Sequence, residues 1–329
     1  MGNILAIETS CDETSISVIK NGDTILSNII YSQIKHHKKF GGVVPEIASR
    51  MHAEKIHSIL DLALQEANLD LDNIQNIAVT YGPGLEGSLL VGLTMAKTIS
   101  SVKKIPLIGV NHLVGHIYAH FLSKKHPPFP FVALIASGGH TQLIEVQNHT
   151  KIKLIGETRD DAAGEAFDKV AKFLNLGYPG GPIIEKKAKE GNSNAIKFPK
   201  ALLKEGFEFS FSGLKTAVIQ TCNKNKNLKV EDICASFQHT VAETLKIKAQ
   251  QACTFTKSSD LVLAGGVFAN QYIISYFKNQ LEPNHINVHT IPPVLCTDNA
   301  AMIGAAAHYM IKHNIYPKLP LKSTPNLKI

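Results

Sequence analysis

Cysteine is scarce in this 329-residue sequence, and the few cysteines present form no recognisable framework. The five are odd in number and widely separated: Cys11, Cys222, Cys234, Cys253 and Cys296. No two of them have the Cys-x-x-Cys spacing that zinc ribbons use. The pattern therefore argues against a zinc ribbon and a disulfide scaffold, and it is typical of a protein in a reducing compartment.

Long hydrophobic runs are also missing. No apolar segment is long enough to span a bilayer, and the chain enters a strand-like run at residues 4–7 without a charged and apolar leader. The contents of 44% hydrophobic and 19% charged residues are typical of a soluble globular protein, and the length suffices for two domains. We therefore expect no membrane association and a cytoplasmic location.

Acidic residues are outnumbered by basic ones. The chain has 27 Asp and Glu against 34 Lys and Arg, a formal net charge of +7. The basic residues are dense at residues 35–39, 186–189 and 224–226, and any one of these segments is typical of a solvated face. Together they weakly favour a polyanionic partner.

One long segment has no acidic residue at all, and this absence argues against a dinucleotide site. Residues 82–87, GPGLEG, match the G-x-G-x-x-G pattern between a strand-like and a helix-like segment. A Rossmann site also needs an acidic residue about 20 positions later to bind the ribose. Residues 88–144 contain none, and Pro83 removes one backbone donor. We interpret the motif as a turn that begins a helix.

Strand-like and helix-like segments alternate along the chain, which predicts an α/β architecture. Residues 4–19 and 131–146 each have the pattern strand, polar turn, strand, and their turns carry acids, hydroxyls or glycines. Such turns can present backbone N–H groups to a phosphate, and their repetition predicts two related lobes. A third glycine turn, residues 264–271, leads into a helix, and either a structural turn or a nucleotide contact explains it.

Two histidines, His112 and His116, are one helical turn apart. Side chains at i and i+4 share one face of a helix, so both imidazoles can bind one metal ion that takes a third ligand from elsewhere. The peptidase form of this spacing has a general-base Glu directly after the first His, where this chain has Leu113. The pattern indicates metal binding without that base, although two ordinary helix-surface histidines remain the alternative.

Carboxylates near helix starts have two interpretations. Asp298 precedes a helix of small residues at 300–307, where it is expected as an N-cap or, through the fold, as the third metal ligand. Asp161, Glu165 and Asp168 have the spacing of one helical face.

Further on, residues 209–215 combine aromatics, hydroxyls and a lysine, a combination that can stack on bases. Core packing is the simpler interpretation of the two phenylalanines in this segment.

Ten segments in order resemble the bacterial TsaD branch of the TsaD/Kae/Qri family of threonylcarbamoyltransferases. The resemblance covers nearly the whole chain. The segments are IETSCDET (7–14), GGVVPE (41–46), GPGL (82–85), HLVGH (112–116), SGGHT (137–141), DDAAGEAFDK (160–169), YPGGP (178–182), FSGLK (211–215), GGVFAN (265–270) and CTDN (296–299).

The resemblance implies a fold and an activity. The fold would be the two-lobed actin/sugar-kinase/Hsp70-like (ASKHA) fold with a duplicated mixed-sheet core. Residues 1–110 would form the N-terminal lobe, to which a C-terminal helix at 300–329 returns, and residues 111–299 the C-terminal lobe. The activity would be transfer of threonylcarbamoyl from threonylcarbamoyl-AMP to N6 of the adenosine at position 37 of tRNAs that read codons starting with adenine. Implied partners are the tRNA anticodon loop, a TsaB paralogue as heterodimer and the ATPase TsaE.

The resemblance also implies site residues. His112, His116 and Asp298 would bind one divalent metal ion, iron(II) in preference to zinc, and Asp12 is a candidate for proton removal or amine orientation. Glu185 stands where many relatives have Asp. The implied substrate-binding residues are Ile135, Ala136, Ser137, Gly138, Gly139, Asp168, Gly181, Glu185 and Asn270.

Two other functions stay open. A metal-dependent glycoprotein endopeptidase would use the histidine pair, but Leu113 occupies the place of its base. An ATPase or kinase of the same two-lobed fold is also compatible with the architecture. Such enzymes have no reason to carry His112, His116 and Asp298 together.

Overall fold

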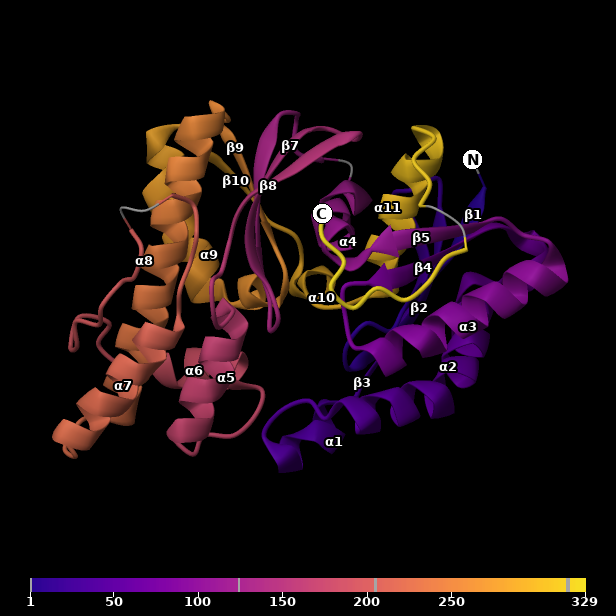
Figure 1. Cartoon of the computed structure of the whole chain (residues 1–329). Helices are drawn as coiled ribbons and strands as arrows, with labels where there is room; N and C mark the ends of the chain where they lie inside the picture. The colour runs from indigo at the N-terminus through magenta and orange to yellow at the C-terminus, as the bar shows by residue number, and fades with distance from the viewer. Residues whose placement is uncertain (1, 124, 204–205, 318–319) are drawn as a thin grey trace. The chain divides into compact units, whose positions relative to one another are not determined.

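The computed structural model describes residues 2–123, 125–203, 206–317 and 320–329 (Figure 1). The chain folds into two compact units, the first comprising Met1–Pro127 with Thr297–Ile329 and the second Pro128–Cys296. The sequence led us to expect divisions at 110 and 299 instead. The helix that carries both histidines belongs to the first unit because it packs against the C-terminal helix of that unit.

The first unit is built on a five-stranded mixed sheet in the order β3-β2-β1-β4-β5. β1 pairs antiparallel with β2 and parallel with β4, and β5 continues the parallel half. The strands are β1 Asn3–Glu8, β2 Glu13–Lys20, β3 Thr24–Ser32, β4 Ile74–Gly82 and β5 Leu107–Asn111. The helices are α1 Ile34–His37, α2 Pro45–Ala67, α3 Glu86–Lys103, α4 His112–Tyr118 and α11 Ala300–Lys312.

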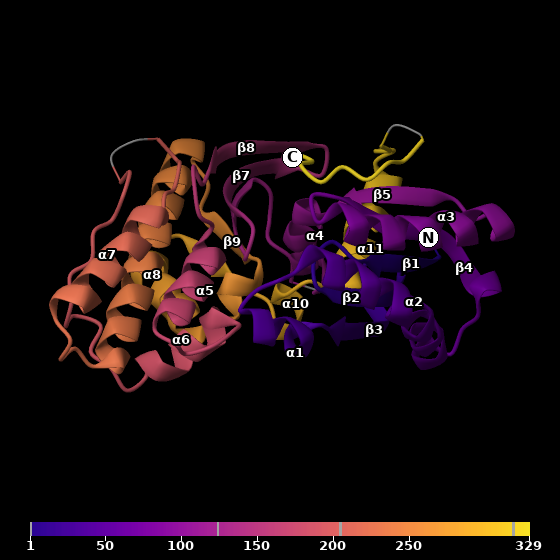
Figure 2. The ribbon, with the colours of Figure 1, turned by 60° about the horizontal axis from the view of Figure 1, so that its bottom comes forward.

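Helices cover both faces of this sheet (Figures 1 and 2). A Cβ atom on Gly304 of α11 would lie 3.3 Å from Ala6, whereas one on Gly92 of α3 would lie 3.4 Å from Ile7. Because successive side chains of a strand point to opposite faces, α11 and α3 lie on opposite sides of β1. This explains why β1 is a continuous apolar run rather than an alternating one.

The second unit repeats the same topology. Its sheet has the order β10-β9-β6-β7-β8, with β6 antiparallel to β7 and parallel to β9. The strands are β6 Phe131–Ala136, β7 Thr141–Asn148, β8 Lys151–Glu157, β9 Asp260–Ala264 and β10 Asn287–His289. The helices are α5 Ala163–Phe173, α6 Gly180–Ala188, α7 Ser212–Lys224, α8 Val230–Thr256, α9 Gln271–Leu281 and α10 Pro293–Cys296.

The two expected hairpins occupy equivalent positions in the two sheets. β1 and β2 form the first, and β6 and β7 form the second. In each unit the first strand of the hairpin is also the one that pairs with the parallel half of the sheet. The predicted duplicated mixed-sheet α/β core is therefore confirmed.

Two local predictions were wrong. The expected C-terminal helix over 300–329 ends at Lys312, and the described residues after it form no further helix or strand. Asp161 lies before α5 rather than on its face, since the helix begins at Ala163. Its carboxylate instead forms ion pairs with Lys169 and Lys215.

No helix in the described ranges is long and apolar enough to cross a membrane.

Candidate metal centre and ligand pocket

The histidine pair lies on α4, directly after the carboxyl end of β5. The side chain of Asn111 caps this helix, because its Oδ1 accepts hydrogen bonds from the backbone N–H groups of Leu113 and Val114 at 2.9 and 3.3 Å. His112 and His116 then follow one turn apart, as predicted, and both rings are buried. They are therefore core residues, and the prediction of an ordinary surface pair is wrong.

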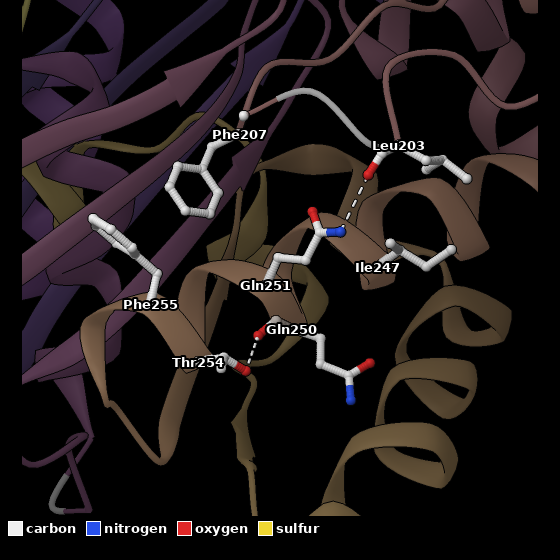
Figure 3. A pocket seen from close by; sticks show the side chains of 8 residues that line it. Leu203, Phe207, Ile247, Gln250, Gln251, Thr254 and Phe255 are labelled. Atoms are coloured by element: carbon white, nitrogen blue, oxygen red, sulfur yellow. Dashed lines mark hydrogen bonds between the residues drawn. The ribbon is translucent and has the colours of Figure 1, made fainter.

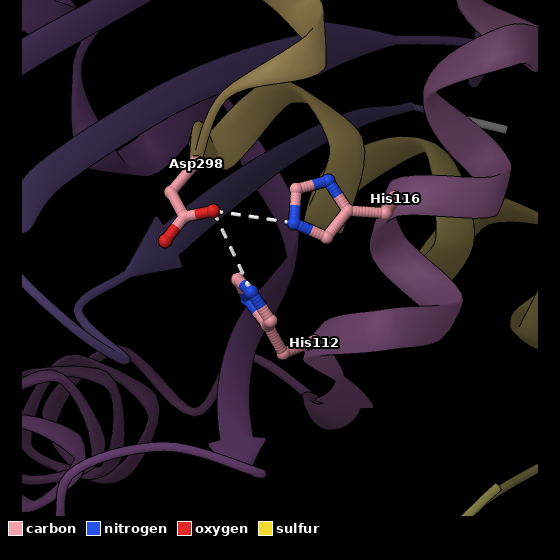
Figure 4. Close-up of side chains that lie close together, drawn as sticks. All are labelled: His112, His116 and Asp298. Atoms are coloured by element: carbon pink, nitrogen blue, oxygen red, sulfur yellow. Dashed lines mark ion pairs between the residues drawn. The ribbon is translucent and has the colours of Figure 1, made fainter. Parts of the chain in front are cut away.

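Asp298 is brought to these rings by the packing of α4 against α11. A Cβ atom on Gly115 would lie only 2.7 Å from Ile303 of α11, so glycine permits this close approach. Oδ1 of Asp298 lies 3.2 Å from Nε2 of His116 and 3.5 Å from Nε2 of His112 (Figure 4). The three side chains converge on one point.

Asp298 is not the N-cap of α11, so that sequence-based interpretation is wrong. Its neighbour Asn299 has the role, with Oδ1 accepting a hydrogen bond from the N–H of Met302 at 3.1 Å. Because Asn299 satisfies the end of the helix, the carboxylate of Asp298 can turn towards the histidines.

The donor atoms fit a metal ion. One ligand atom from each of the three residues lies within 4.8 Å of the other two. Within the described part of the chain, neither ring nitrogen of the buried His116 has a hydrogen-bond partner, although Nε2 faces the Asp298 carboxylate. Two imidazoles and a carboxylate are the three-ligand set of a site that keeps further coordination positions open.

Glu8, at the end of β1, orients the first histidine. Its Oε2 lies 3.1 Å from Nδ1 of His112, and it also accepts a hydrogen bond from the Thr80 hydroxyl at 2.5 Å. A proton on Nδ1 shared with this carboxylate leaves the Nε2 lone pair directed at Asp298, the arrangement common behind metal-bound histidines. Sequence reasoning gave Glu8 no role, although this acid ends an apolar strand and lies in the family segment 7–14.

The carboxylates make this position favourable for positive charge. Burial alone would raise the pKa of the Glu8 carboxyl, but the His112 ring outweighs it and the pKa lies below its ordinary value. Burial likewise lowers the pKa of His112, yet the charges of Asp298 and Glu8 raise it to about 9. A bound cation would satisfy both carboxylates in the same way.

The Glu8→Gln variant tests this orienting contact. We expect metal affinity to fall about 10- to 100-fold, because the neutral amide lacks the charge that favours the Nδ1–H contact at Oε2, and its NH2 group cannot accept the hydrogen bond that the Ser10 N–H donates to Oε1. Calorimetric titration of metal-stripped protein measures the effect. Glu46→Gln removes an exposed carboxylate from α2 and serves as the matched control. Unchanged affinity in Glu8→Gln would show that Glu8 only stabilises the fold.

Asp12 lies in the turn between β1 and β2, in the same acidic environment. Its side chain is largely buried, and burial raises the pKa of its carboxyl, with the charge of Asp298 adding to the effect. A raised pKa makes a carboxylate a stronger base than an ordinary aspartate. Asp12 is therefore placed near the metal ligands with the property that a proton acceptor needs.

A pocket of about 350 Å³ lies in the second unit, and this volume is within the range of small-molecule sites. It contains five of the nine predicted substrate-binding residues, namely Gly138, Asp168, Gly181, Glu185 and Asn270. The other lining residues lie in the family segments 160–169, 178–182 and 265–270 but were not themselves predicted to bind substrate: Gly164, Phe167, Pro179, Pro182, Gly266, Val267 and Ala269.

Close backbone approaches form the walls of this pocket. Gly265 has φ +94°, and a Cβ atom there would lie 2.5 Å from the carbonyl oxygen of Ala136, so the turns after β9 and β6 touch. A Cβ atom on Gly180 would lie 2.4 Å from the carbonyl oxygen of Phe167. In contrast, a Cβ atom on Gly138 would meet no atom within 4 Å, so this glycine leaves space open.

The polar side chains of the pocket are held in place. Oδ1 of Asp168 accepts a hydrogen bond from the Gly180 N–H at 2.7 Å, and Oε1 of Glu185 accepts one from the Gln271 N–H at 2.8 Å. Asn270 caps α9 through Oδ1 and donates from Nδ2 to Gln238 at 2.7 Å. Such anchored groups can orient a ligand without first being ordered.

The other four predicted residues do not line the pocket. The side chains of Ile135 and Ala136 are fully buried in β6, and Oγ of Ser137 accepts a hydrogen bond from the His140 N–H within the turn. Gly139 adjoins Gly138 but is not part of the lining. Their contribution is the shape of the turn that carries Gly138.

A second pocket of about 630 Å³ lies along α8 (Figure 3). Its lining includes Leu203, Phe207, Ile247 and Phe255, and no lining residue has a titratable side chain. It therefore lacks groups for acid–base or metal chemistry. The nearby phenylalanines Phe209 and Phe211 are buried, which confirms core packing rather than base stacking for both.

Comparisons with known proteins agree on a family and on a fold. A family model described as "TsaD: tRNA N6-adenosine threonylcarbamoyltransferase" matches residues 24–305. A protein of that name from Clostridioides difficile (strain 630) is 51% identical, with 99% of this chain and 98% of the relative covered. One from Desulfitobacterium hafniense (strain Y51) is 50% identical, with coverages of 99% and 97%.

More distant solved structures share the fold alone. HypF from T. kodakarensis has a TM-score of 0.67 at 16% identity, covering 97% of this chain and 49% of that one. Component A of (R)-2-hydroxyglutaryl-CoA dehydratase from Acidaminococcus fermentans has a TM-score of 0.58 at 14% identity, covering 95% and 99%. Both likenesses agree with the two-lobed ASKHA-type architecture.

Proposed function

The chain belongs to the TsaD family of tRNA N6-adenosine threonylcarbamoyltransferases, and from this premise we propose a role for each of its two sites. The enzyme is an acyltransferase that modifies tRNA. We propose that the donor is threonylcarbamoyl-AMP and the acceptor is the adenosine at position 37 of tRNAs that read codons starting with adenine. The N6 amine forms a bond to the carbamoyl carbon, the bond from that carbon to the phosphate oxygen breaks, and AMP leaves.

The pocket of the second unit supports binding of the adenylate part of the donor. Its volume and its five predicted residues are the observations that carry this assignment. Asp168 and Glu185 are acceptors suited to ribose hydroxyls, and in the first turn of α6 the N–H of Gly181 can donate to a phosphate. The open face at Gly138 leaves room for the ligand.

We propose that His112, His116 and Asp298 of the first unit bind one divalent ion, iron(II) in preference to zinc, and the convergence of their ligand atoms supports this. Mixed nitrogen and oxygen ligation suits both metals. A bound ion would supply Lewis-acid polarisation of the acyl donor or of its anhydride. Glu8 holds the His112 ring in the tautomer that such binding requires.

Asp12 is proposed as the group that accepts the proton of the attacking amine or orients it. The exocyclic amine of adenine is a weak nucleophile, because its lone pair is delocalised into the ring. Removal of a proton as the new bond forms therefore lowers the barrier. Burial and the charge of Asp298 raise the pKa of Asp12, which strengthens it as a base.

The partners and the location are proposed on the basis of family membership. We propose that the chain acts in the cytoplasm as a heterodimer with a TsaB paralogue, together with the ATPase TsaE. The tRNA anticodon loop is already single-stranded, so presenting the target base costs less than removing it from a duplex.

The peptidase alternative lacks its base. Leu113 occupies the position after the first histidine, and its side chain is buried in the fold. Metal-dependent cleavage of a peptide or glycoprotein by the pure protein would be needed to restore that function.

Mass analysis of tRNA nucleosides tests the proposed function. The purified chain is incubated with its partner proteins, threonylcarbamoyl-AMP and unmodified tRNA. We expect threonylcarbamoyladenosine in tRNAs that have adenosine at position 37, and none in a matched tRNA with guanosine there. Absence of the product under these conditions would overturn the proposal.

A further inference from the structure

A short cationic surface follows β3 in the first unit. Residues 24–45 contain no Asp or Glu, and within them Lys35, Lys38 and Lys39 are exposed on α1 and the 3-10 turn Lys38–Phe40. None of these three lysines forms an ion pair with a carboxylate of the described residues. In the basic segment at 186–189, by contrast, Lys187 is paired with Glu231.

An aromatic ring is part of this surface. The side chain of Phe40 is 47% exposed, and Nζ of Lys39 lies 5.1 Å from its ring centroid. An exposed ring flanked by unpaired cations is the combination with which proteins bind single-stranded nucleic acid: the ring stacks on a base while the cations contact phosphates. We call Lys35, Lys38, Lys39 and Phe40 the α1 surface.

A buried histidine holds the α1 surface in one conformation. The backbone N–H of Val44 donates to Nδ1 of His37 at 3.3 Å, so the ring proton is on Nε2, which donates to Oε1 of Gln33 at 3.1 Å. Because the His37 ring points inward, the lysines and the phenylalanine beside it point outward. The surface is thus ordered before any ligand binds, which lowers the entropic cost of binding.

The α1 surface is also tied to the turn that contains Asp12. The backbone N–H of Gln33, the residue before α1, donates to the carbonyl oxygen of Asp12 at 3.0 Å. Any nucleic acid on the α1 surface is therefore bound beside the segment that we propose to act on the amine.

We propose that the α1 surface binds the tRNA anticodon region, with the three lysines on backbone phosphates and Phe40 stacked on an unpaired base. The inference rests on the proposed function and names the surface that positions its acceptor. A single-stranded loop suits it, because unstacked bases are free to meet an aromatic side chain.

Equilibrium binding of labelled tRNA to the complex with its partner proteins tests the lysines. For Lys38→Ala/Lys39→Ala we expect about tenfold weaker binding and a slope of log Kd against log salt smaller by between one and two. Lys224→Ala/Lys226→Ala makes the same charge change at the end of α7 and just beyond it, and it should leave both unchanged. Equal losses in both variants would show non-specific attraction and overturn the proposal.

Phe40 has its own variant series. Phe40→Ala should weaken binding of tRNA and of an isolated anticodon stem-loop about tenfold, while Phe40→Trp should retain it. Phe255→Ala, which removes an exposed ring from α8, is the control and should have no effect. Unchanged binding in Phe40→Ala would overturn the stacking contact.

Two further measurements separate this inference from the proposed function. AMP binding and metal content should be unaltered in every α1-surface variant, which shows that the fold and the two sites are intact. If the parent enzyme makes threonylcarbamoyladenosine and the variants bind tRNA as it does, the surface assignment is wrong and the function stands. If the variants lose binding to anionic lipid vesicles rather than to tRNA, the surface is a lipid contact and the inference is overturned.

Discussion

Replacing His112 by alanine is expected to abolish metal uptake and to reduce threonylcarbamoyl transfer on the order of a thousandfold. The ring supplies one of only three protein ligands found among the described residues, and it is the ligand that Glu8 orients. A metal ion that polarises an acyl donor contributes several kcal/mol to the transition state, which corresponds to a loss of this size. Elemental analysis of the purified variant and single-turnover transfer to tRNA measure the two effects.

The histidine variants carry their own controls. His116→Ala should reproduce both losses, because the two rings converge on the same carboxylate. His57→Ala removes an exposed histidine from α2 and should change neither metal content nor transfer. AMP binding should be retained throughout, since the pocket lies in the second unit. Full activity of His112→Ala without bound metal would disprove the metal-dependent mechanism.

Both candidate sites lie at the carboxyl ends of parallel strands. In the first unit Glu8 ends β1, and α4 with its histidines follows β5. In the second unit Gly138 follows β6, and Gly265 follows β9. This is the edge at which open α/β sheets bind ligands. The loops that follow the strands can vary in sequence there, while the strands fix the position at which each loop begins. Each of the two sheets therefore has a candidate site at this edge. The site of the first unit contains carboxylates, and the site of the second unit contains glycine turns.

Local spacing made part of this arrangement predictable. The placement of His112 and His116 on one helix face depends only on the helical period. The two hairpins were likewise predicted from a local pattern of strand, turn and strand. The assignment of Asp298 came from the family resemblance, because spacing favoured an N-cap. Asn299 and Asp298 are both capable caps, and only the path of the chain into α11 decides between them.

Other features depend on contacts that are distant in sequence. Glu8 and His112 are 104 residues apart, and nothing in either local pattern indicates that they touch. The resemblance placed Ile135 and Ala136 at the substrate, but their side chains are buried in β6 and only the following turn reaches the pocket. The spacing of Asp161, Glu165 and Asp168 predicted a helix that includes Asp161. This residue lies in the loop before α5, because the helix begins only at Ala163.

Replacing Gly138 by leucine should close the pocket that we propose for the adenylate, without unfolding the protein. Gly138 lines the pocket, and a Cβ atom there would meet no atom within 4 Å. The leucine side chain would therefore fill space that a bound ligand needs. We expect AMP affinity to fall on the order of a hundredfold, because the clash acts only on the bound state. The free energy of unfolding should stay within about 1 kcal/mol of the parent value, since no native contact is disturbed.

Gly213→Leu is the matched control for this change. Gly213 lies in the first turn of α7, a Cβ atom there also meets no atom within 4 Å, and it does not line the pocket. Both variants should fold alike and retain metal at the histidine centre, so that only Gly138→Leu loses AMP binding and transfer. Loss of AMP binding in both variants would point to a general effect of the added side chain. Retention of AMP binding in Gly138→Leu would mean that the adenylate binds elsewhere, and the pocket would lose its proposed role while the metal centre kept its own.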